Sequence, residues 1–600
     1  MVMREIETLV RRYLAIRYAI AGSYDDAEGA IYYLSDVTGE QILWKAIRTP
    51  ASYRHDIPIP WERRINSYRP SPTGYIAFST DVDGDEKWSI YIARGNVIKL
   101  VSGEDGTINN LGEWSPSGRY LSYSSNSRNG VDFDLYIYDI HTEKSSKILE
   151  NDGLLSPSRW ISDGELLAVK MYTYQDTDIL LIRRSDGSTI NLTKHSGEAQ
   201  NRSPIPIDDR FFIFITNEGE EFTGIAIYDL EKKSWKYIVK ESWDVELIDY
   251  RSGVLAYVVN EDGSSVFKLY TLGGSSSIEV LRLWGTIDDI DLFNGGALLS
   301  INSPRHGQEI FITDFSGLLE RVTYSPKIGI SEDSFISPER FTYRSFDGLE
   351  IHGLLYKPSK TSREPYPAVI YLHGGPESQE RVVFNRIHQA ILSLGIAVIA
   401  PNYRGSSGYG KSFIHLDDVD RRINAVHDVY HAVEHLSKKG EIDPSRLCVM
   451  GGSYGGYLTL MMLSIYPDMW RCGVEIVGIV NLITFIRNTG AWRRRYRIVE
   501  YGDPEIHGDI MLKLSPITYV DRIKAPLMVI HGARDPRVPV TEAEQLIEAL
   551  RSRDREVRYI RLEDEGHGVS KVRNRVRVYT EAVKFIYSNL IEGSHSQLSG

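Results

Sequence analysis

One serine in this sequence stands in a setting that could make it a nucleophile. GGSYG (451–455) matches the pattern G-x-S-x-G around Ser453. The apolar run LCVM (447–450) precedes it, and the helix-like run YLTLMMLSIY (457–466) follows it. A strand, a sharp turn and a helix in this order form a nucleophile elbow, which exposes the serine hydroxyl at a sheet edge. Because the turn is tight, we expect side chains in place of its glycines to clash with neighbouring backbone. We therefore predict that Ser453 is the nucleophile of a hydrolase.

An acid and a histidine follow Ser453 in the order that such a hydrolase requires. The apolar run LMVI (527–530) leads into HGARDPRVP, which places Asp535 just past a predicted strand. VRYIRL (557–562) leads into EDEGHG, which places His567 past the next strand. We expect His567 to accept the proton of Ser453 and later give it to the leaving group, while Asp535 fixes the tautomer of the imidazole.

Three other side chains compete for these roles. His531 stands at the end of its predicted strand, where structural packing is the better interpretation. Asp564 and Glu565 flank His567 and either could orient it, but both are too close in sequence to wrap easily around the ring.

Two further patterns suggest chemistry that the rest of the chain does not support. His427, His431 and His435 recur every four residues on a predicted helix, but no H-E-x-x-H pattern accompanies them. GSSGYGKS (405–412) matches the P-loop pattern G-x-x-x-x-G-K-[ST]. A nucleotide site also needs an acid at a second strand end to hold magnesium, and the predicted triad already uses Asp535. We expect no metal and no cofactor, and keep nucleotide binding as a remote alternative.

The oxyanion formed during acyl transfer needs hydrogen-bond donors. The Tyr454 N–H, at the start of the predicted helix, is one. YLHGGPES, which includes the end of the apolar run AVIYL (368–372), supplies another, because its two glycines let the backbone approach the substrate oxygen closely. We favour the Gly375 N–H as this second donor, with Gly374 as the next choice.

The period of the apolar residues predicts the elements that position these side chains. From about residue 340, strand-like runs alternate with longer helix-like segments; the runs are AVIYL (368–372), AVIA (397–400), LCVM (447–450), GVEIV (473–477), LMVI (527–530) and VRYIRL (557–562). This alternation predicts a doubly wound, mostly parallel sheet covered on both faces. With the elbow, it indicates an α/β-hydrolase domain over residues 336–593, whose chemistry lies at the carboxyl ends of the strands.

The first half of the chain contains a repeat. Seven stretches join a Gly or Asp turn to alternating apolar residues, with anchors at Gly29, Gly74, Gly118, Gly164, Asp209, Gly253 and Gly296. The anchors lie 43 to 46 residues apart, and most units add a second strand-like run. This period predicts a β-propeller over residues 22–335, because one small sheet cannot bury both of its faces alone. We expect seven blades, with six or eight as alternatives.

Composition and charge exclude several classes of protein. A chain of 600 residues is too long for one core, which favours at least two domains. The net charge of −12 argues against nucleic acid, and we interpret Arg493–Arg495 as a short solvated run. No apolar run approaches the roughly 20 residues of a membrane span, and the first residues form an amphipathic helix rather than a signal peptide. We expect a cytoplasmic protein that binds neither membrane nor nucleic acid.

Five motifs, with the preceding propeller, resemble the prolyl oligopeptidase family of serine peptidases, and most of all its acylaminoacyl-peptidase branch. They are LHGGP (372–376), NYRGSSGYG (402–410), GGSYGGY (451–457), DPRVP (535–539) and DEGHG (564–568). The resemblance implies an N-terminal helix, residues 1–21, that packs on the hydrolase domain. It also implies a propeller that admits short peptides and excludes folded proteins, and it makes the P-loop match coincidental. We expect residues 594–600 to form a flexible tail.

Three positions distinguish the branches of that family. His373 stands where the prolyl oligopeptidase and dipeptidyl-peptidase branches place a tyrosine that helps to hold the oxyanion, which favours two backbone donors here. Glu220-Glu221 is the nearest pair to the glutamates with which dipeptidyl peptidases hold a free amino terminus, but the surrounding motif is missing. Arg537 matches an arginine beside the active site of acylaminoacyl relatives, and is a candidate for binding the peptide; a structural ion pair is the alternative.

Together these features predict a serine peptidase that cleaves short peptides through an acyl-enzyme and releases N-acylated amino acids from blocked peptides. The alternatives are an aminopeptidase or oligopeptidase without N-acyl preference, a carboxylesterase, and a non-enzymatic propeller scaffold. The family includes monomers, dimers and larger assemblies, so a homo-oligomer is left open.

Overall fold

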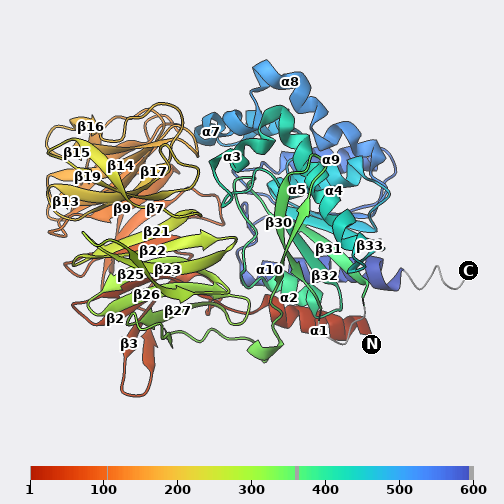
Figure 1. Cartoon of the computed structure of the whole chain (residues 1–600), viewed down its shortest axis with the longest axis horizontal. Helices are drawn as coiled ribbons and strands as arrows, with labels where there is room; N and C mark the ends of the chain where they lie inside the picture. The colour runs from red at the N-terminus through yellow and green to blue at the C-terminus, as the bar shows by residue number, and fades with distance from the viewer. Residues whose placement is uncertain (1, 104–105, 359–363, 594–600) are drawn as a thin grey trace, which may run out of the picture.

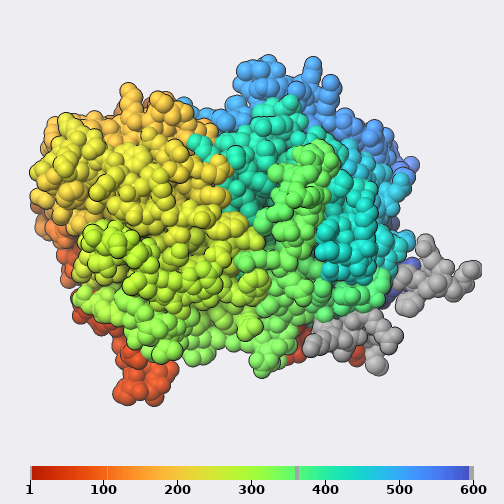
Figure 2. All heavy atoms as spheres, viewed as in Figure 1, coloured from red at the N-terminus to blue at the C-terminus, as the bar shows by residue number. Residues whose placement is uncertain are grey.

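The protein consists of two parts that lie side by side in the computed structural model, which describes residues 2–103, 106–358 and 364–593. Figure 1 shows a β-propeller formed by the first half of the chain next to a layered α/β domain formed by the second half. In the space-filling view the two parts touch along their common boundary (Figure 2). The segment 594–600, expected to be a flexible tail, lies outside the described residues.

The propeller has seven blades within the described residues, as the repeat predicts. Each blade is an antiparallel sheet of four consecutive strands. In chain order, the blades contain β1 (Ala19–Asp25), β2 (Ala30–Ser35), β3 (Ile42–Arg48) and β4 (Tyr53–Asp56); β5 (Ser67–Pro70), β6 (Ile76–Thr80), β7 (Ser89–Arg94) and β8 (Val97–Ser102); β9 (Asn109–Trp114), β10 (Tyr120–Ser125), β11 (Asp134–Asp139) and β12 (Lys144–Leu149); β13 (Leu154–Ser162), β14 (Glu165–Met171), β15 (Thr177–Arg183) and β16 (Thr189–Asn191); β17 (Asn201–Pro206), β18 (Phe211–Thr216), β19 (Gly224–Asp229) and β20 (Ser234–Val239); β21 (Val245–Arg251), β22 (Val254–Glu261), β23 (Ser264–Thr271) and β24 (Ser277–Arg282); β25 (Thr286–Phe293), β26 (Gly296–Ser303), β27 (Gly307–Thr313) and β28 (Glu320–Arg321).

The sequence repeat corresponds to the second strand of each blade, and the run that follows it corresponds to the third. β10, for example, begins two residues after its anchor Gly118 and is buried along its whole length. The outermost strand of each blade was not predicted, because a strand that is largely exposed to solvent need not alternate apolar residues. In β12, for example, four of six residues are exposed. Apolar alternation therefore marks the buried middle of a blade and not its rim.

Adjacent blades hold each other through apolar clusters. Each of seven clusters joins two neighbouring blades. The ring closes where Ala19 and Tyr33 of the first blade pack against Leu298 and Ile310 of the last. β1 begins at Ala19, so the propeller starts three residues before the expected boundary at residue 22.

The second part is built on an eight-stranded sheet in the order β29-β30-β32-β31-β33-β34-β35-β36. The strands are β29 (Glu339–Arg344), β30 (Glu350–Tyr356), β31 (Tyr366–Leu372), β32 (Ala397–Asn402), β33 (Ile442–Gly452), β34 (Cys472–Ile476), β35 (Leu527–Gly532) and β36 (Val557–Leu562). The pairs β29–β30 and β30–β32 are antiparallel, and the other pairs are parallel. The mostly parallel α/β-hydrolase sheet is therefore confirmed, and β29 and β30 extend it beyond the six predicted strands.

Helices cover both faces of this sheet. They are α1 (Val2–Leu14), α2 (Arg386–Leu392), α3 (Lys411–Ile414), α4 (Ile423–Lys438), α5 (Tyr454–Ile465), α6 (Leu482–Asn488), α7 (Ala491–Tyr501), α8 (Pro504–Lys513), α9 (Thr541–Arg551) and α10 (Val572–Tyr587). One apolar layer joins α4, α5, α6 and α9 to the sheet, and the other joins α1, α2 and α10 to the opposite face. α1 thus lies against the hydrolase domain, beside α2 (Figure 1).

The described part of the chain contains no helix that is long and apolar enough to cross a membrane. The two cysteines, Cys448 and Cys472, face each other on neighbouring strands, and both are buried free thiols.

Candidate active site

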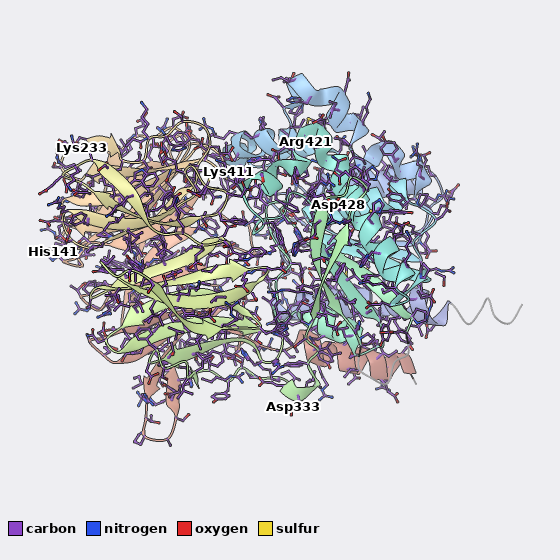
Figure 3. All side chains as sticks on the ribbon, viewed as in Figure 1. His141, Lys233, Asp333, Lys411, Arg421 and Asp428 are labelled. Atoms are coloured by element: carbon purple, nitrogen blue, oxygen red, sulfur yellow. The ribbon has the colours of Figure 1, made fainter. Side chains whose placement is uncertain are left out.

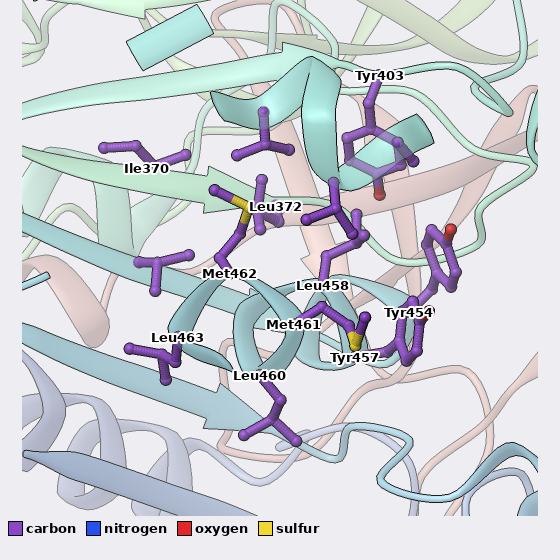
Figure 4. Packing of buried hydrophobic residues seen from close by; sticks show 14 of the residues in the cluster. Ile370, Leu372, Tyr403, Tyr454, Tyr457, Leu458, Leu460, Met461, Met462 and Leu463 are labelled. Atoms are coloured by element: carbon purple, nitrogen blue, oxygen red, sulfur yellow. The ribbon is translucent and has the colours of Figure 1, made fainter. Parts of the chain in front are cut away.

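Ser453 occupies a strained turn between β33 and α5. Its backbone has φ 58° and ψ −118°, a left-handed conformation that costs a residue with a side chain about 1–3 kcal/mol. The Ser453 N–H donates to the carbonyl oxygen of Ile476 on the next strand, at 2.9 Å. Helix α5 begins at once with Tyr454 and packs its apolar side chains against the sheet (Figure 4). This packing holds the turn in place and points the serine out of the sheet edge.

Close backbone packing explains two of the three glycines in the turn. A Cβ atom at Gly451 would overlap the carbonyl oxygen of Gly455, and one at Gly455 would overlap the carbonyl oxygen of Leu372. At Gly452, by contrast, a Cβ would meet nothing nearer than 3.7 Å. The expected clash is therefore present at Gly451 and Gly455 but not at Gly452.

The structure brings Ser453, His567 and Asp535 together in one hydrogen-bonded chain. The Nε2 atom of His567 lies 3.0 Å from the Ser453 Oγ, and its Nδ1 lies 2.7 Å from the Asp535 Oδ2. Asp535 follows β35 and His567 follows β36, so each residue stands at the carboxyl end of a parallel strand. His567 is 114 positions from Ser453 and 32 positions from Asp535 in the sequence, and the sheet brings the three residues together.

Asp535 is buried and heavily hydrogen-bonded. Its other oxygen, Oδ1, accepts from the N–H groups of Arg537 and Val538 at 2.8 and 3.0 Å. Burial by itself would raise the pKa of Asp535, but the charge and hydrogen bond of His567 outweigh burial and lower the pKa below its ordinary value. Asp535 is therefore an ionised carboxylate at neutral pH. It accepts a hydrogen bond from the Nδ1–H of His567, so that the Nε2 can accept a hydrogen bond from the Ser453 hydroxyl.

The competing side chains have other partners. His531 is buried behind Asp535, with its Nε2 2.9 Å from the carbonyl oxygen of Val538 and 3.7 Å from the Asp535 Oδ2. Asp564 forms ion pairs with Lys571 at 3.0 Å and with Arg573. Glu565 accepts hydrogen bonds from Ser570, the Lys571 N–H and Asn574. Both acids thus shape the loop that carries His567 rather than contact its ring.

The histidines on α4 contact separate side chains and do not converge on one point. His427 bonds the Tyr466 hydroxyl at 2.7 Å, and His431 pairs with Glu434. Within the described ranges, no group of three or more His, Cys, Asp or Glu side chains could hold a metal ion.

The predicted oxyanion donors lie beside the serine. Gly374 and Gly375 line the same cavity as Ser453, and the Tyr454 N–H is the first of α5, where N–H groups have no partner within the helix. His373 is buried and turned away: its ring stacks on Tyr403 with centroids 4.3 Å apart. Burial lowers the pKa of His373 to about 4, so it is a neutral packing residue and not an oxyanion ligand.

A cavity of about 290 Å³ opens next to Ser453. Gly374, Gly375, Ser378, Ser453, Ile479, Phe485, Thr489, Arg493, Arg497, Tyr501, Arg537, Val538 and His567 line it. Arg537 both lines this cavity and forms an ion pair, with its Nε 2.5 Å from the Glu86 Oε1 of the propeller. The two interpretations of Arg537 are therefore compatible.

Among the cavity residues that sequence reasoning missed, Arg493 and Arg497 are the charged ones. The interpretation of Arg493–Arg495 as a solvated run is wrong for Arg493, which is 7% exposed and lines the cavity. The spacing of these residues could have indicated a shared site. Arg493, Arg497 and Tyr501 recur every four residues, which places them on one face of α7.

A propeller loop reaches the histidine loop. Gly84, between β6 and β7, lies so close to Gly566 that a Cβ at Gly566 would overlap the Gly84 carbonyl oxygen. Next to it, Asp83 forms an ion pair with Lys571. The candidate active site therefore faces the propeller, and residues from both parts of the protein enclose it.

The P-loop-like segment 405–412 binds a carboxylate of the protein itself. The Glu221 Oε1 accepts from the N–H and the hydroxyl of Ser412 at 2.7 and 2.6 Å. A Cβ at Gly410 would collide with the same oxygen, and α3 is only four residues long. Lys411 lies at the boundary with the propeller and donates to the Glu198 carbonyl oxygen (Figure 3). The segment is thus an interdomain contact in this protein.

Comparison with known proteins points to one family. Residues 383–592 match the model of the prolyl oligopeptidase family. The dipeptidyl aminopeptidase BIII of Pseudoxanthomonas mexicana is 35% identical over 215 residues, which are 35% of this chain and 31% of that protein. The acylamino-acid-releasing enzyme of Homo sapiens is 29% identical over 254 residues, 41% of this chain and 34% of that one. These matches thus span about a third of the length of each relative.

The likeness in fold extends over nearly the whole chain. The structure of the Pyrococcus horikoshii acylaminoacyl peptidase superposes with a TM-score of 0.76, at 20% sequence identity, and covers 96% of both chains. The chain thus combines the propeller and α/β-hydrolase fold of that structure with a hydrolase part, residues 383–592, that matches the prolyl oligopeptidase family.

Proposed function

We propose that this protein is a serine peptidase that cleaves short peptides and releases N-acylated amino acids from blocked peptides. The observation that carries the proposal is the chain of two hydrogen bonds from Asp535 through His567 to Ser453, beside an open cavity. A buried carboxylate, an imidazole whose Nε2 faces the serine, and a hydroxyl that borders a cavity are the groups that covalent acyl transfer needs.

The proposed reaction proceeds through an acyl-enzyme. The Ser453 Oγ attacks the peptide carbonyl carbon while the His567 Nε2 takes the serine proton, and the N–H groups of Gly375 and Tyr454 bind the oxyanion. His567 then gives this proton to the amine as the C–N bond breaks. Water attacks the resulting ester, His567 accepts its proton and returns it to Ser453, and the N-acylated amino acid leaves.

The charge of the cavity supports a blocked amino terminus. A free α-amino group has a pKa of about 8 and is largely cationic at neutral pH, and Arg493, Arg497 and Arg537 line the cavity. An acyl group removes the positive charge and with it the repulsion. The two glutamates that could hold an ammonium group bind elsewhere: Glu220 pairs with Lys240, and Glu221 caps the loop at Ser412.

A second candidate is an aminopeptidase or oligopeptidase that accepts free amino termini. The 35% identity to a dipeptidyl aminopeptidase favours it, although that match covers 35% of this chain. A carboxylesterase would use the same triad, but the propeller loop over the histidine favours a substrate whose size is limited by the second domain.

The test compares one short peptide in two forms, amino-terminally acetylated and free, by kcat/KM, with Ser453→Ala as the blank. We expect the acetylated form to be cleaved better, and cleavage of both forms to disappear in Ser453→Ala. Equal or faster cleavage of the free peptide would leave an aminopeptidase or oligopeptidase. Cleavage that persists in Ser453→Ala would show that Ser453 is not the nucleophile.

A further inference from the structure

Three arginines converge on the cavity beside the nucleophile. Arg493 and Arg497 come from one face of α7, and Arg537 comes from the loop after β35. None of the described residues that line this cavity carries a carboxylate. A cluster of guanidinium groups around one cavity is costly, because like charges repel and the repulsion is stronger where the groups are buried, as Arg493 is and Arg497 is in part.

The nearest carboxylates only partly neutralise the cluster. Glu86 is shared: its Oε1 lies 2.5 Å from the Nε of Arg537, whereas its Oε2 is 3.5 Å from an Nη of Arg493. That Oε2 forms no hydrogen bond within the described part of the chain. Arg493 therefore stands beside a carboxylate that is already engaged with Arg537.

Arg497 shares its partner as well. Its Nη1 bonds Glu500 at 3.1 Å, and Glu500 also pairs with the fully buried Arg422 at 3.4 Å. Arg422 has a further acid, Asp417, at 3.5 Å. Glu377 also faces Arg497, but burial raises its pKa, which weakens its contribution as an anion.

Arg493 is the least compensated of the three. Its side chain is 8% exposed, and burial together with the charges of Arg537 and Arg497 lowers its pKa. A buried cation that shares its carboxylate with a second arginine is incompletely compensated, and this is costly. An anionic group supplied by a ligand would compensate this charge, and guanidinium groups bind carboxylates through paired hydrogen bonds.

The rest of the wall suits an aliphatic stem. Ile479, Phe485 and Val538 line the cavity together with Ser453 and the arginines. A volume of about 290 Å³ lies at the small end of the range for ligand pockets. A short apolar chain that ends in a carboxylate matches this combination of apolar wall and cationic groups.

We propose that this cavity, the arginine pocket, selects peptides that carry a carboxylate close to the cleaved bond. The carboxylate belongs to a Glu or Asp side chain, or to the free carboxyl terminus of a very short peptide. The inference rests on the proposed function, because it names the substrate class of the same site.

Two pairs of N-acetylated substrates test the proposal. In the first pair, carboxyl-amidated peptides carry either Glu or Gln at the residue whose carbonyl is attacked. In the second pair, one Ala peptide has either a free or an amidated carboxyl terminus. We expect kcat/KM to favour the acidic member of one pair by roughly tenfold or more, the contribution of one charge-assisted hydrogen bond. The pair that shows the preference identifies the source of the carboxylate.

Arg493→Gln should reduce this preference to nearly one. Arg487→Gln is the matched control, because Arg487 is exposed on α6, pairs with the exposed Glu505 and lies outside the cavity; it should keep the wild-type ratio. Equal cleavage within both pairs by the wild type, or a full preference in a folded Arg493→Gln, would overturn the proposal. If Arg493→Gln does not fold, Arg497→Gln is compared in its place.

A binding measurement separates this proposal from the proposed function. N-acetylglutamate should stabilise Ser453→Ala against heat at lower concentration than N-acetylglutaminamide does, because the latter carries no carboxylate. Selective binding without Ser453-dependent hydrolysis would leave the arginine pocket in place and overturn the peptidase assignment. Ser453-dependent hydrolysis without any preference for acidic ligands, in either kinetics or binding, would keep the peptidase assignment and overturn the arginine pocket.

Discussion

Asp535 carries its negative charge inside the protein, and its hydrogen bonds orient the carboxylate toward His567. Its Oδ1 is held by the two N–H groups of Arg537 and Val538, which leaves the Oδ2 directed at the Nδ1 of the imidazole. His531 closes the site from behind. The position of the carboxylate is thus set by backbone donors and does not depend on a flexible side chain.

Asp535→Asn should lower kcat by about 10⁴-fold, because the amide can donate to Nδ1 and stabilise the wrong tautomer of the imidazole. KM should change much less, since Asp535 does not line the cavity. Steady-state kinetics on an acetylated peptide, with a melting curve to verify folding, provides the measurement. Asp564→Asn serves as the control and should lose less than tenfold, because Asp564 pairs with Lys571 and Arg573. Similar losses in the two variants would contradict the role of Asp535.

The elbow works as a junction of three elements, and its geometry depends on how closely α5 approaches β31. Gly455 lies in the first turn of α5 against the Leu372 carbonyl oxygen at the end of β31. Behind it, Leu458 and Met461 pack into the apolar layer with Leu372 (Figure 4). The apolar packing of the helix therefore stabilises the strained backbone of Ser453.

Gly455→Ala should destabilise the protein by about 3 kcal/mol or more, the upper end for overpacking, because the new methyl group would meet backbone that cannot move aside. It should also lower kcat by displacing Ser453. Gly452→Ala, one residue on the other side of the serine, should change stability by less than about 1 kcal/mol, since its Cβ has space. Chemical denaturation followed by fluorescence measures both. If the two variants unfold at the same denaturant concentration, the proposed packing limit at Gly455 is wrong.

At the scale of the whole molecule, polar contacts connect the propeller to the hydrolase domain around the active site. Glu86 reaches Arg537, Glu221 caps the loop at Ser412, and Glu198 pairs with His415 at 2.9 Å. His415 also bonds Asp418 at 2.8 Å. The contact between the two parts therefore includes ionisable groups, and its strength should change with pH.

Hydrogen bonds to Asp418 and Glu198 raise the pKa of His415 to about 10. In the unfolded chain this pKa is about 6.5, so the contact stabilises the fold fully below pH 6.5 and is lost as pH rises toward 10. The Tm of the wild type should therefore fall more steeply between pH 6.5 and 10 than that of His415→Gln.

Scanning calorimetry at several pH values measures this difference. His141→Gln is the control, since His141 is exposed at the outer edge of the propeller (Figure 3), and it should follow the wild type. Parallel curves for wild type and His415→Gln would show that the pair contributes nothing to stability.

Local patterns in the sequence predicted the main parts of the fold. The seven turns predicted seven blades, because the second strand of each blade is buried on both sides and therefore keeps its apolar residues. The order of Ser453, Asp535 and His567 predicted which residues meet, because parallel strands bring their carboxyl ends to one edge. Exposed outer strands such as β12 were missed, since solvent relaxes the apolar pattern there.

The character of the pocket was decided by tertiary structure alone. Arg537 meets Glu86 across 451 residues, and the buried Arg493 of α7 lies 3.5 Å from the same propeller carboxylate. Glu221 enters the segment that matches a P-loop, which no local pattern could indicate. The sequence by itself determined the elements, the order of the triad and the elbow, because these depend on local sterics and on the burial of each strand. Which charges share the cavity depends on where two separately folded parts touch, and that contact exists only in three dimensions.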